Sequence, residues 1–108
     1  MRVLVGAAVA LSLAGCGGSL ATWSGGTTFA EFSLTGETQT VVNAKAGCHL
    51  DGALVGDRGT VKTFAIDTQS ATYTVELSAG NYKIGLSPDV SPDELSGCSG
   101  IMVTIDKQ

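Results

Sequence analysis

Residues 72–86 read TYTVELSAGNYKIGL, and the alternation of apolar and polar side chains in this stretch decides the fold class. Successive side chains of a strand point to opposite faces, so a period of two places one set of residues toward a core. The apolar set is Tyr73, Val75, Leu77, Tyr82, Ile84 and Leu86. The Ala79-Gly80-Asn81 step favours a tight turn, because Gly and Asn tolerate positive φ. The stretch therefore predicts two β-strands joined as a hairpin.

The same pattern continues outward from this stretch to residue 29 on one side and residue 106 on the other. Short segments rich in Thr, Val, Ile and Tyr are separated by Gly, Asn and Asp at intervals of about ten residues, and none has a useful helical period. Strands are predicted at 29–34, 39–44, 48–55, 61–67, 72–78, 82–86 and 101–106. We expect an all-β fold, a small antiparallel β-sandwich or barrel of about seven strands. Further residues expected to face the core are Phe64, Ile66, Ile101, Val103 and Ile105.

Residues 75–87, VELSAGNYKIGLS, resemble the penultimate hairpin of bacterial pre-peptidase C-terminal-type β-sandwich domains. The shared pattern is Leu-x-Ala-Gly-x-Tyr-x-Ile, which here occupies residues 77–84. The resemblance implies a β-sandwich. It implies nothing about function, since one fold hosts many activities.

The N-terminus has the pattern of an export signal. Arg2 is the only charge before Glu31, and the apolar run 3–13 that follows it is broken only by Gly6 and Ser12. A helix of this length spans about 16 Å, roughly half the hydrocarbon thickness of a bilayer, so the run is too short for a stable transmembrane anchor. The pattern indicates a signal helix that is cleaved.

The run ends in Leu13-Ala14-Gly15-Cys16, which resembles the lipobox of bacterial lipoprotein precursors at all four positions. The resemblance implies cleavage after Gly15, a diacylglyceryl thioether on Cys16, and an amine that can be acylated as well. Several acyl chains, at about 0.8 kcal/mol per buried CH₂, make membrane attachment effectively permanent. Gly17 follows the cysteine where an aspartate would favour the inner membrane, which implies the outer membrane in a host with two membranes.

Three segments are therefore expected: a signal peptide 1–15, the lipidated cysteine with a tether over 16–26, and a β domain 27–108. Residues 17–26 read GGSLATWSGG. Such a Gly/Ser-rich stretch predicts a flexible tether with an r.m.s. reach of about 17 Å. Trp23 is the exception, because its ring favours either the membrane interface or packing against the domain. We expect it to pack against the domain.

Lipidation of Cys16 leaves Cys48 and Cys98 of the three cysteines. An exported chain meets an oxidising compartment where its host has one, so we expect these two residues to form a disulfide. The bond would enclose about 50 residues and stabilise the fold by about 4 kcal/mol in the chain-entropy model. It would also leave no free thiol for nucleophilic catalysis.

The long connection 87–100 is the candidate interaction loop, because surface loops of this length carry function more often than the strands they join. Ser-Pro-Asp occurs in it twice, and the second copy continues as Ser91-Pro92-Asp93-Glu94, the capping-box signature of a helical turn. The candidate site residues are Ser87, Pro88, Asp89, Ser91, Pro92, Asp93 and Glu94.

Patterns for metal sites are weak. His49 beside Cys48 suggests zinc, but neighbouring residues of a strand point to opposite faces, and only one further cysteine is left. Asp89, Asp93 and Glu94 lack the alternating oxygen ligands of a calcium loop. We therefore predict no metal site and no cofactor other than the covalent lipid.

Catalytic patterns are few as well. The sequence has one histidine, no Gly-x-Ser-x-Gly, no Gly-rich phosphate loop and no carboxylates spaced as an acid/base pair, so we predict that the protein is not an enzyme. The formal charge is −4, and loss of Arg2 with the signal leaves five basic and ten acidic residues, or −5. An acidic surface repels nucleic acid, so no nucleic-acid partner is expected, and it either attracts basic partners or serves solubility alone.

These observations favour a membrane-anchored envelope lipoprotein with a non-catalytic binding or assembly role and another envelope protein as its partner. Three alternatives stay open. The first is an inhibitor of a basic enzyme such as lysozyme, although the loop motif of such inhibitors is not found here. The others are a phage- or plasmid-type exclusion lipoprotein and a purely structural lipoprotein.

Overall fold

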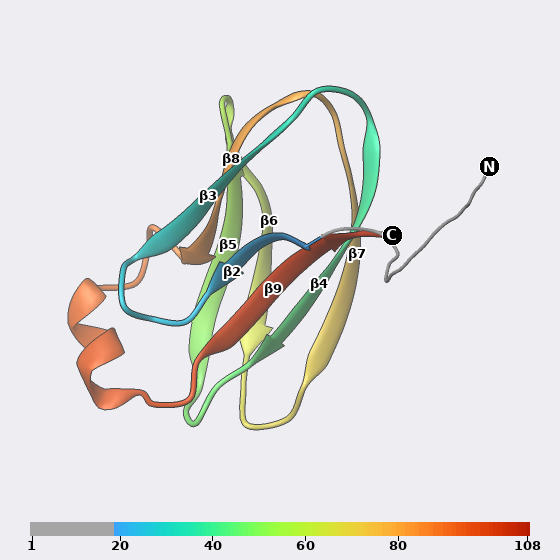
Figure 1. Cartoon of the computed structure of the whole chain (residues 1–108). Coiled ribbons are helices and arrows are strands. Elements are labelled where there is room, and N and C mark those ends of the chain that lie inside the picture. Colours follow the sequence, from blue (N-terminus) through green and yellow to red (C-terminus); the bar gives the residue numbers. More distant parts are fainter. Residues whose placement is uncertain (1–18) are drawn as a thin grey trace.

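The computed structural model of the chain describes residues 19–108, which form eight strands and one 3-10 helix (Figure 1). The predicted signal peptide, the 13–16 motif with the cysteine that is predicted to carry lipid, Gly17 and Gly18 lie outside the described residues. Within residues 19–108, no helix is both long enough and apolar enough to cross a bilayer.

The strands form two four-stranded antiparallel sheets that pack against each other (Figure 1). The order of the first sheet is β2 (Ser19–Trp23), β9 (Met102–Lys107), β4 (Thr38–Lys45) and β7 (Ala71–Leu77). The order of the second sheet is β3 (Phe29–Leu34), β8 (Gly80–Leu86), β5 (Leu50–Gly56) and β6 (Gly59–Ile66). The helix η1 (Pro92–Gly97) lies in the connection between β8 and β9.

The predicted all-β fold class is confirmed, and of the two predicted architectures, sandwich or barrel, the structure has the sandwich. Each of the seven predicted strands is present, with ends shifted by at most two residues. β5 begins at Leu50, two residues after its predicted start, so Cys48 and His49 precede it. The eighth strand, β2, was not predicted.

The predicted hairpin at residues 79–81 is wrong. β7 pairs with β4, whereas β8 pairs with β3 and β5, so the two strands lie in opposite sheets. Leu77, Tyr82 and Ile84 are nevertheless buried, as the alternation predicts. An apolar face can point inward from either sheet, so alternation assigns the face of a strand but not its partner. Among the described strands, only β5 and β6 are both consecutive and paired.

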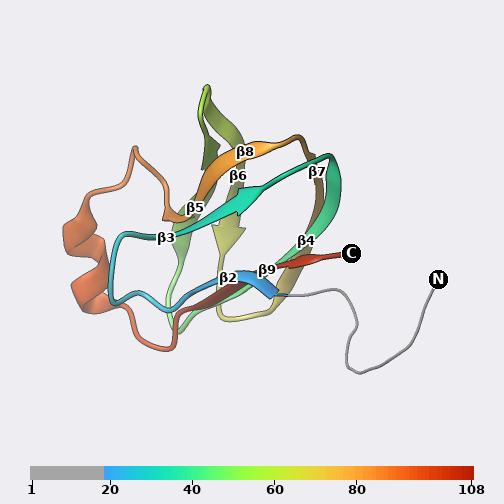
Figure 2. The same ribbon diagram turned by 45° about the horizontal axis from the view of Figure 1, so that its top comes forward.

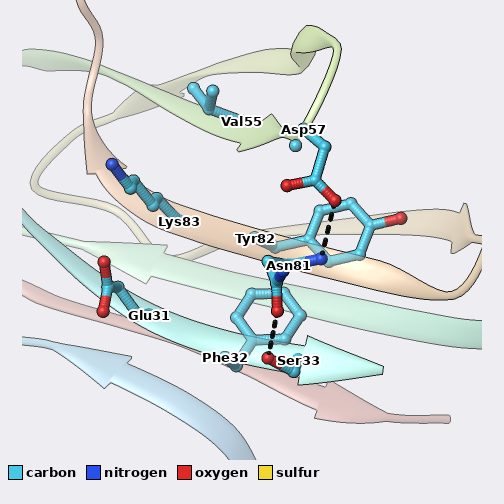
Figure 3. Close-up of a pocket in the computed structure, with 9 residues that line it drawn as sticks. Glu31, Phe32, Ser33, Val55, Asp57, Asn81, Tyr82 and Lys83 are labelled. Carbon is cyan, nitrogen blue, oxygen red and sulfur yellow. Dashed lines mark hydrogen bonds between the residues drawn. The ribbon is translucent and has the colours of Figure 1, made fainter. Parts of the chain in front are cut away.

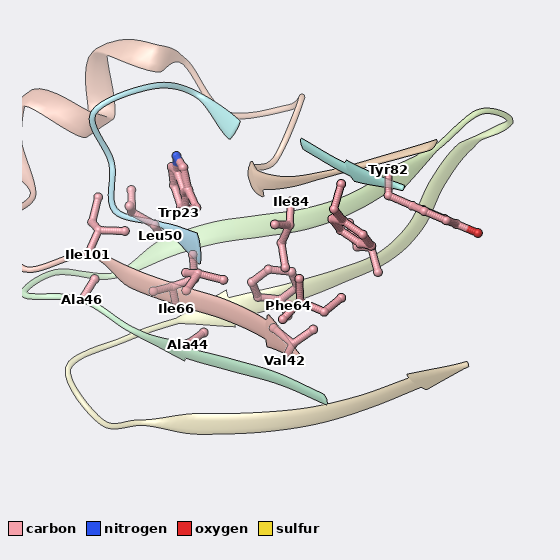
Figure 4. Packing of buried hydrophobic residues seen from close by; sticks show 14 of the residues in the cluster. Trp23, Val42, Ala44, Ala46, Leu50, Phe64, Ile66, Tyr82, Ile84 and Ile101 are labelled. Atoms are coloured by element: carbon pink, nitrogen blue, oxygen red, sulfur yellow. The ribbon is translucent and has the colours of Figure 1, made fainter. Parts of the chain in front are cut away.

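The core lies between the two sheets, and the inward-facing side of every strand contributes to it (Figure 4). Phe32 and Tyr82 stack with their ring centroids 5.4 Å apart. The largest side chains that are less than 2% exposed are Trp23, Leu54, Ile66, Ile84, Ile105, Val42, Val103 and Thr40. All of the residues predicted outside the 72–86 stretch are buried as well, namely Phe64, Ile66, Ile101, Val103 and Ile105.

The predicted tether is wrong for residues 19–23, which form β2 at the edge of the first sheet. β2 pairs with β9, and Trp23 at its end is 1% exposed, with the indole N–H donating to the Thr27 carbonyl at 2.7 Å. The expected packing of Trp23 against the domain is therefore confirmed. The composition of this segment did not indicate a strand, because the strand-favouring residues Thr22 and Trp23 lie in a stretch rich in glycine and serine.

Cys48 and Cys98 form a disulfide, as predicted, with an S–S distance of 2.02 Å and a Cα–Cα distance of 5.4 Å. The bond joins the turn before β5 to the residue that follows η1. Beside it, the Gly47 N–H donates to the Ser99 carbonyl at 2.6 Å. The long connection is thus held against the β4–β5 turn at two adjacent points.

Candidate binding groove

The 87–100 connection begins with a tight turn. The Val90 N–H donates to the Ser87 carbonyl at 3.0 Å, which places Pro88 and Asp89 at the two central positions of the turn. Ser87 is 5% exposed, and its N–H donates to the Asp51 carbonyl of β5 at 2.9 Å. Its Oγ accepts from the Asp89 N–H at 3.4 Å. Ser87 therefore fixes the loop to the second sheet, and little of it is exposed where it lines the groove.

The predicted helical turn is confirmed as η1, with Ser91 as its N-cap. The Ser91 Oγ accepts from the Asp93 N–H at 3.3 Å, and the Ser91 carbonyl accepts from the Glu94 N–H at 3.0 Å. In a capping box the hydroxyl bonds the third helical residue, so the cap here differs by one position from the predicted one. Asp93 and Glu94 are exposed, whereas Leu95 packs against the core.

An apolar groove of about 370 Å³ lies on the outer side of the second sheet, where this turn meets the start of β3. Ala53 of β5 faces outward but is 1% exposed and belongs to no core cluster, because the loop covers this part of the sheet. Phe29 of β3 is 37% exposed at the opposite side. The lining residues are Thr28, Phe29, Ala53, Val55, Lys83, Gly85, Leu86, Ser87, Pro88, Val90 and Pro92.

Gly85 determines the shape of the groove. It lies between Phe29 and Ala53 in the register of the sheet. A Cβ atom built on Gly85 would lie 2.6 Å from the Phe29 Cα, closer than real side chains come. The Leu86 N–H also donates to the Thr28 carbonyl at 2.9 Å. The missing side chain at position 85 therefore lets β3 approach and leaves space between Phe29 and the loop.

Lys83 is the only charged residue that lines the groove. Its Nζ lies 4.6 Å from the centre of the Phe29 ring, within cation–π range. In the sheet it stands between Glu31 of β3 and Val55 of β5. The ring and the ammonium group hold each other in place, and the ammonium group keeps N–H donors for a further acceptor.

A second and more polar pocket of about 320 Å³ adjoins the groove and shares Val55 and Lys83 with it (Figure 3). The Ser33 Oγ donates to the Asn81 Oδ1 at 2.7 Å, and the Asn81 N–H donates to the Asp57 Oδ2 at 3.2 Å. The groove and this pocket follow one another along β8. Together they form a trough that is polar at the start of β8 and apolar at its end.

The structure divides the seven candidate loop residues into two groups. Three of them line the groove: Ser87, Pro88 and Pro92. The other four are outside its lining and lie on the exposed side of the connection or at its turn: Asp89, Ser91, Asp93 and Glu94.

Sequence reasoning missed the strand residues of the groove, above all Phe29 and Lys83. Phe29 shares its face of β3 with Glu31 and Ser33, whereas Phe32 points into the core. An aromatic side chain on the polar face of an alternating strand was the available signal. No local sequence pattern indicated that Lys83 lines the groove, because its position there depends on the pairing of β8 with β3.

His49 lies between two carboxylates near the disulfide. Its Nδ1 is 3.5 Å from the Asp67 Oδ2, and its Nε2 is 3.8 Å from the Asp51 Oδ1, with all three side chains mostly exposed. The Thr68 N–H, which donates to the Asp67 Oδ1 at 2.8 Å, lowers the pKa of Asp67 below its usual value, and His49 adds to this effect. In the described part of the chain, no three His, Cys, Asp or Glu residues gather into a group that could hold a metal ion.

Comparison with protein-family models gave no match for the chain, and comparison with curated protein sequences gave none either.

Proposed function

We propose that the chain is the precursor of a membrane-anchored envelope lipoprotein whose β-sandwich binds another envelope component, without catalysis, through the groove between Phe29 and the 88–92 loop. The observation that carries the binding role is Phe29 itself. It is an aromatic side chain 37% exposed on the polar face of β3, beside an apolar hollow. Apolar surface costs free energy in water, roughly 25 cal/mol per Å², which a bound partner would recover.

The chemistry of the groove suggests the class of group that it binds. Val90 and the two prolines of the loop offer an apolar wall, and prolines lose little freedom on binding because their φ is fixed. Lys83 supplies one positive charge, and no carboxylate lines the groove. The best-fitting ligand is therefore an apolar side chain next to an acidic group, such as a segment of a partner protein.

The sequence supports the lipid anchor. Cys16 ends a motif whose four positions all resemble a lipobox, and the short apolar run before it suits a cleaved signal. Attachment to a membrane fits a small binding module, since it holds the module near partners in the same envelope. An outer-membrane location follows from Gly17 if the host has two membranes.

A second candidate function, inhibition of a basic enzyme such as lysozyme, is favoured by a different surface. The connections next to the disulfide carry Asp67, Asp89, Asp93 and Glu94. These residues lie outside the groove lining, so the two functions would use different side chains. Salt would weaken binding to the acidic face more than binding to the groove.

Site-specific photo-crosslinking in the native envelope tests the groove and separates the two candidates. A photoreactive phenylalanine analogue at Phe29 should give one dominant crosslinked product, and the same analogue at Thr74, exposed on the opposite sheet, should give none. Equal products from both positions would contradict the proposal. A cationic enzyme captured from position Asp93 but not from Phe29 would favour the inhibitor.

Replacement of Phe29 by alanine should weaken binding of the captured partner by more than about tenfold, because buried aromatic anchors contribute 2 kcal/mol or more at interfaces. The measurement is a titration of the purified partner with the β domain. Val61→Ala is the matched control, since Val61 is 46% exposed on β6 and lines neither the groove nor the adjoining pocket. Equal affinities of the two variants would exclude the groove as the binding site.

The Cys16→Ser variant should carry no lipid and should be lost from the outer-membrane fraction. The reason is that the thiol accepts the diacylglyceryl group. Incorporation of labelled palmitate and membrane fractionation measure the result. The Cys48→Ser/Cys98→Ser variant is the control and should still be labelled. A Cys16→Ser chain that is labelled and sediments with the outer membrane would refute the anchor.

A further inference from the structure

The first described strand determines which end of the sandwich lies next to Cys16. Only residues 17 and 18 separate Cys16 from Ser19, where β2 begins. Three steps of fully extended chain reach at most about 11 Å. Whatever holds Cys16 therefore also holds the start of β2 nearby.

β2 is firmly attached to the sandwich and cannot act as additional tether. Its residues pair with β9 from Ser19 opposite Asp106 to Trp23 opposite Val103. Trp23 is 1% exposed and belongs to the core cluster. Release of β2 would expose the indole to water and remove its packing in the core, which strongly disfavours the released state.

The strand directions sort the connections of the sandwich into two ends. The proximal end, where β2 starts, also holds the connections 35–37, 57–58 and 78–79 and the C-terminal residues Lys107 and Gln108. The distal end holds the connections 24–28, 46–49, 67–70 and 87–101, with the disulfide and η1. Figure 2 shows the C-terminus and the β3–β4 turn on one side of the molecule and η1 on the opposite side.

The two ends of the sandwich also differ in charge. The distal connections contain four carboxylate residues and no lysine or arginine: Asp67, Asp89, Asp93 and Glu94. The proximal residues contain two acidic and two basic side chains: Glu37, Asp57, Arg58 and Lys107. With His49 neutral, and with Lys45 at the distal end of β4 counted as Lys107 at the proximal end of β9 is, the side-chain charges sum to −3 at the distal end and to zero at the proximal end. A phosphate-bearing membrane surface therefore repels the distal end and not the proximal one.

We infer that the proximal end of the sandwich faces the membrane surface and that the distal end is presented to the aqueous space. The inference rests on the proposed lipidation of Cys16. The seven residues of β7 connect the two ends and span about 23 Å, which is more than the tether can reach. The bilayer surface itself is thus a contact partner of the proximal turns.

The orientation narrows the choice of ligand for the groove. Pro88, Val90 and Pro92 belong to the distal connection, and Phe29 lies at the distal start of β3. The apolar part of the groove therefore lies at the end of the sandwich away from the bilayer that holds the anchor. Its occupant comes from the aqueous side, as a segment of another protein, and an acyl chain of the same membrane does not reach it.

The test uses the full-length, lipidated protein in vesicles that contain lipid with a nitroxide on the headgroup. Ser70→Cys and Ser78→Cys place a thiol-reactive fluorophore just before and just after β7, at exposed serines of opposite ends. With Cys16 acylated and the other two cysteines bonded, the introduced thiol is the only free one. We expect the label at position 78 to be quenched severalfold more than the label at position 70.

The possible outcomes distinguish a wrong orientation from a missing lipid anchor. Equal quenching in vesicle-bound protein, or stronger quenching at position 70, overturns the orientation while the anchor stands. Failure of the protein to bind vesicles overturns the lipidation and the orientation with it. Glu37→Cys and Asp93→Cys form a second pair with the same expected order, and each removes one carboxylate.

A longer tether tests the physical cause. Ten additional Gly/Ser residues before Ser19 add an r.m.s. reach of about 17 Å, which lets the domain rotate away from the surface. The difference in quenching between positions 70 and 78 should then fall severalfold. An unchanged difference would show that the short tether does not determine the orientation.

Discussion

Replacement of Cys48 and Cys98 together by serine is expected to lower the free energy of unfolding of the β domain by about 4 kcal/mol. The two residues are 50 positions apart, and their bond removes conformations from the unfolded chain in proportion to the logarithm of that length. A small domain has only about 5–15 kcal/mol of stability, so the loss is a large share of the total. Urea unfolding of the soluble domain, residues 17–108, measures it.

Chemical reduction of the unmodified domain is the natural control for this variant. It should give nearly the same midpoint of unfolding, because both treatments remove the same cross-link. A double-serine variant as stable as the oxidised domain would show that the bond contributes nothing. If the reduced domain were stable and the double-serine variant were not, the loss of stability would come from the serine side chains and not from the missing bond.

The disulfide also connects stability to the proposed binding site. The 87–100 connection has two fixed ends, the Ser87 bond to Asp51 of β5 and the Cys98 bond to Cys48. The groove wall between them has little other support, since all residues of η1 except Leu95 are exposed. Loss of the disulfide should therefore loosen η1 before it loosens the strands.

The sequence was informative about strands because each strand has one polar and one apolar face. Tyr82 and Ile84 alternate with Asn81 and Lys83, and the structure buries the first two and exposes the second two. The partner of each strand was harder to predict from the sequence. The same alternation is compatible with a hairpin and with a connection between the two sheets. A hairpin was predicted before Tyr82, whereas in the structure this connection joins β7 of one sheet to β8 of the other.

The candidate site was predictable in its loop and not in its strands. The length of the 87–100 connection marked it as the candidate interaction loop, and the structure places Pro88 and Pro92 of this loop in the groove. Phe29 and Lys83 are 54 positions apart and meet only because β3 pairs with β8. Contacts of this kind depend on long-range pairing, which period-two patterns do not encode.

Truncation of Trp23 to alanine should destabilise the domain by about 3–5 kcal/mol, the usual cost of removing a large buried aromatic side chain. Trp23 is 1% exposed, and its N–H bonds the Thr27 carbonyl in the connection to β3. The effect would be absent if residues 17–26 were a flexible tether. The measurement is again urea unfolding of residues 17–108, followed by circular dichroism because the variant has no tryptophan.

Two controls make the result specific to β2. Thr22→Ala changes the exposed neighbour in the same strand and should cost less than about 1 kcal/mol. In the unmodified domain Trp23 is the only tryptophan, so its fluorescence should be blue-shifted and weakly quenched by acrylamide. Equal stability of the Trp23→Ala and Thr22→Ala variants would show that residues 19–23 belong to a flexible tether and do not form a strand. The anchor would then be long and flexible, and no end of the sandwich would be held at the membrane.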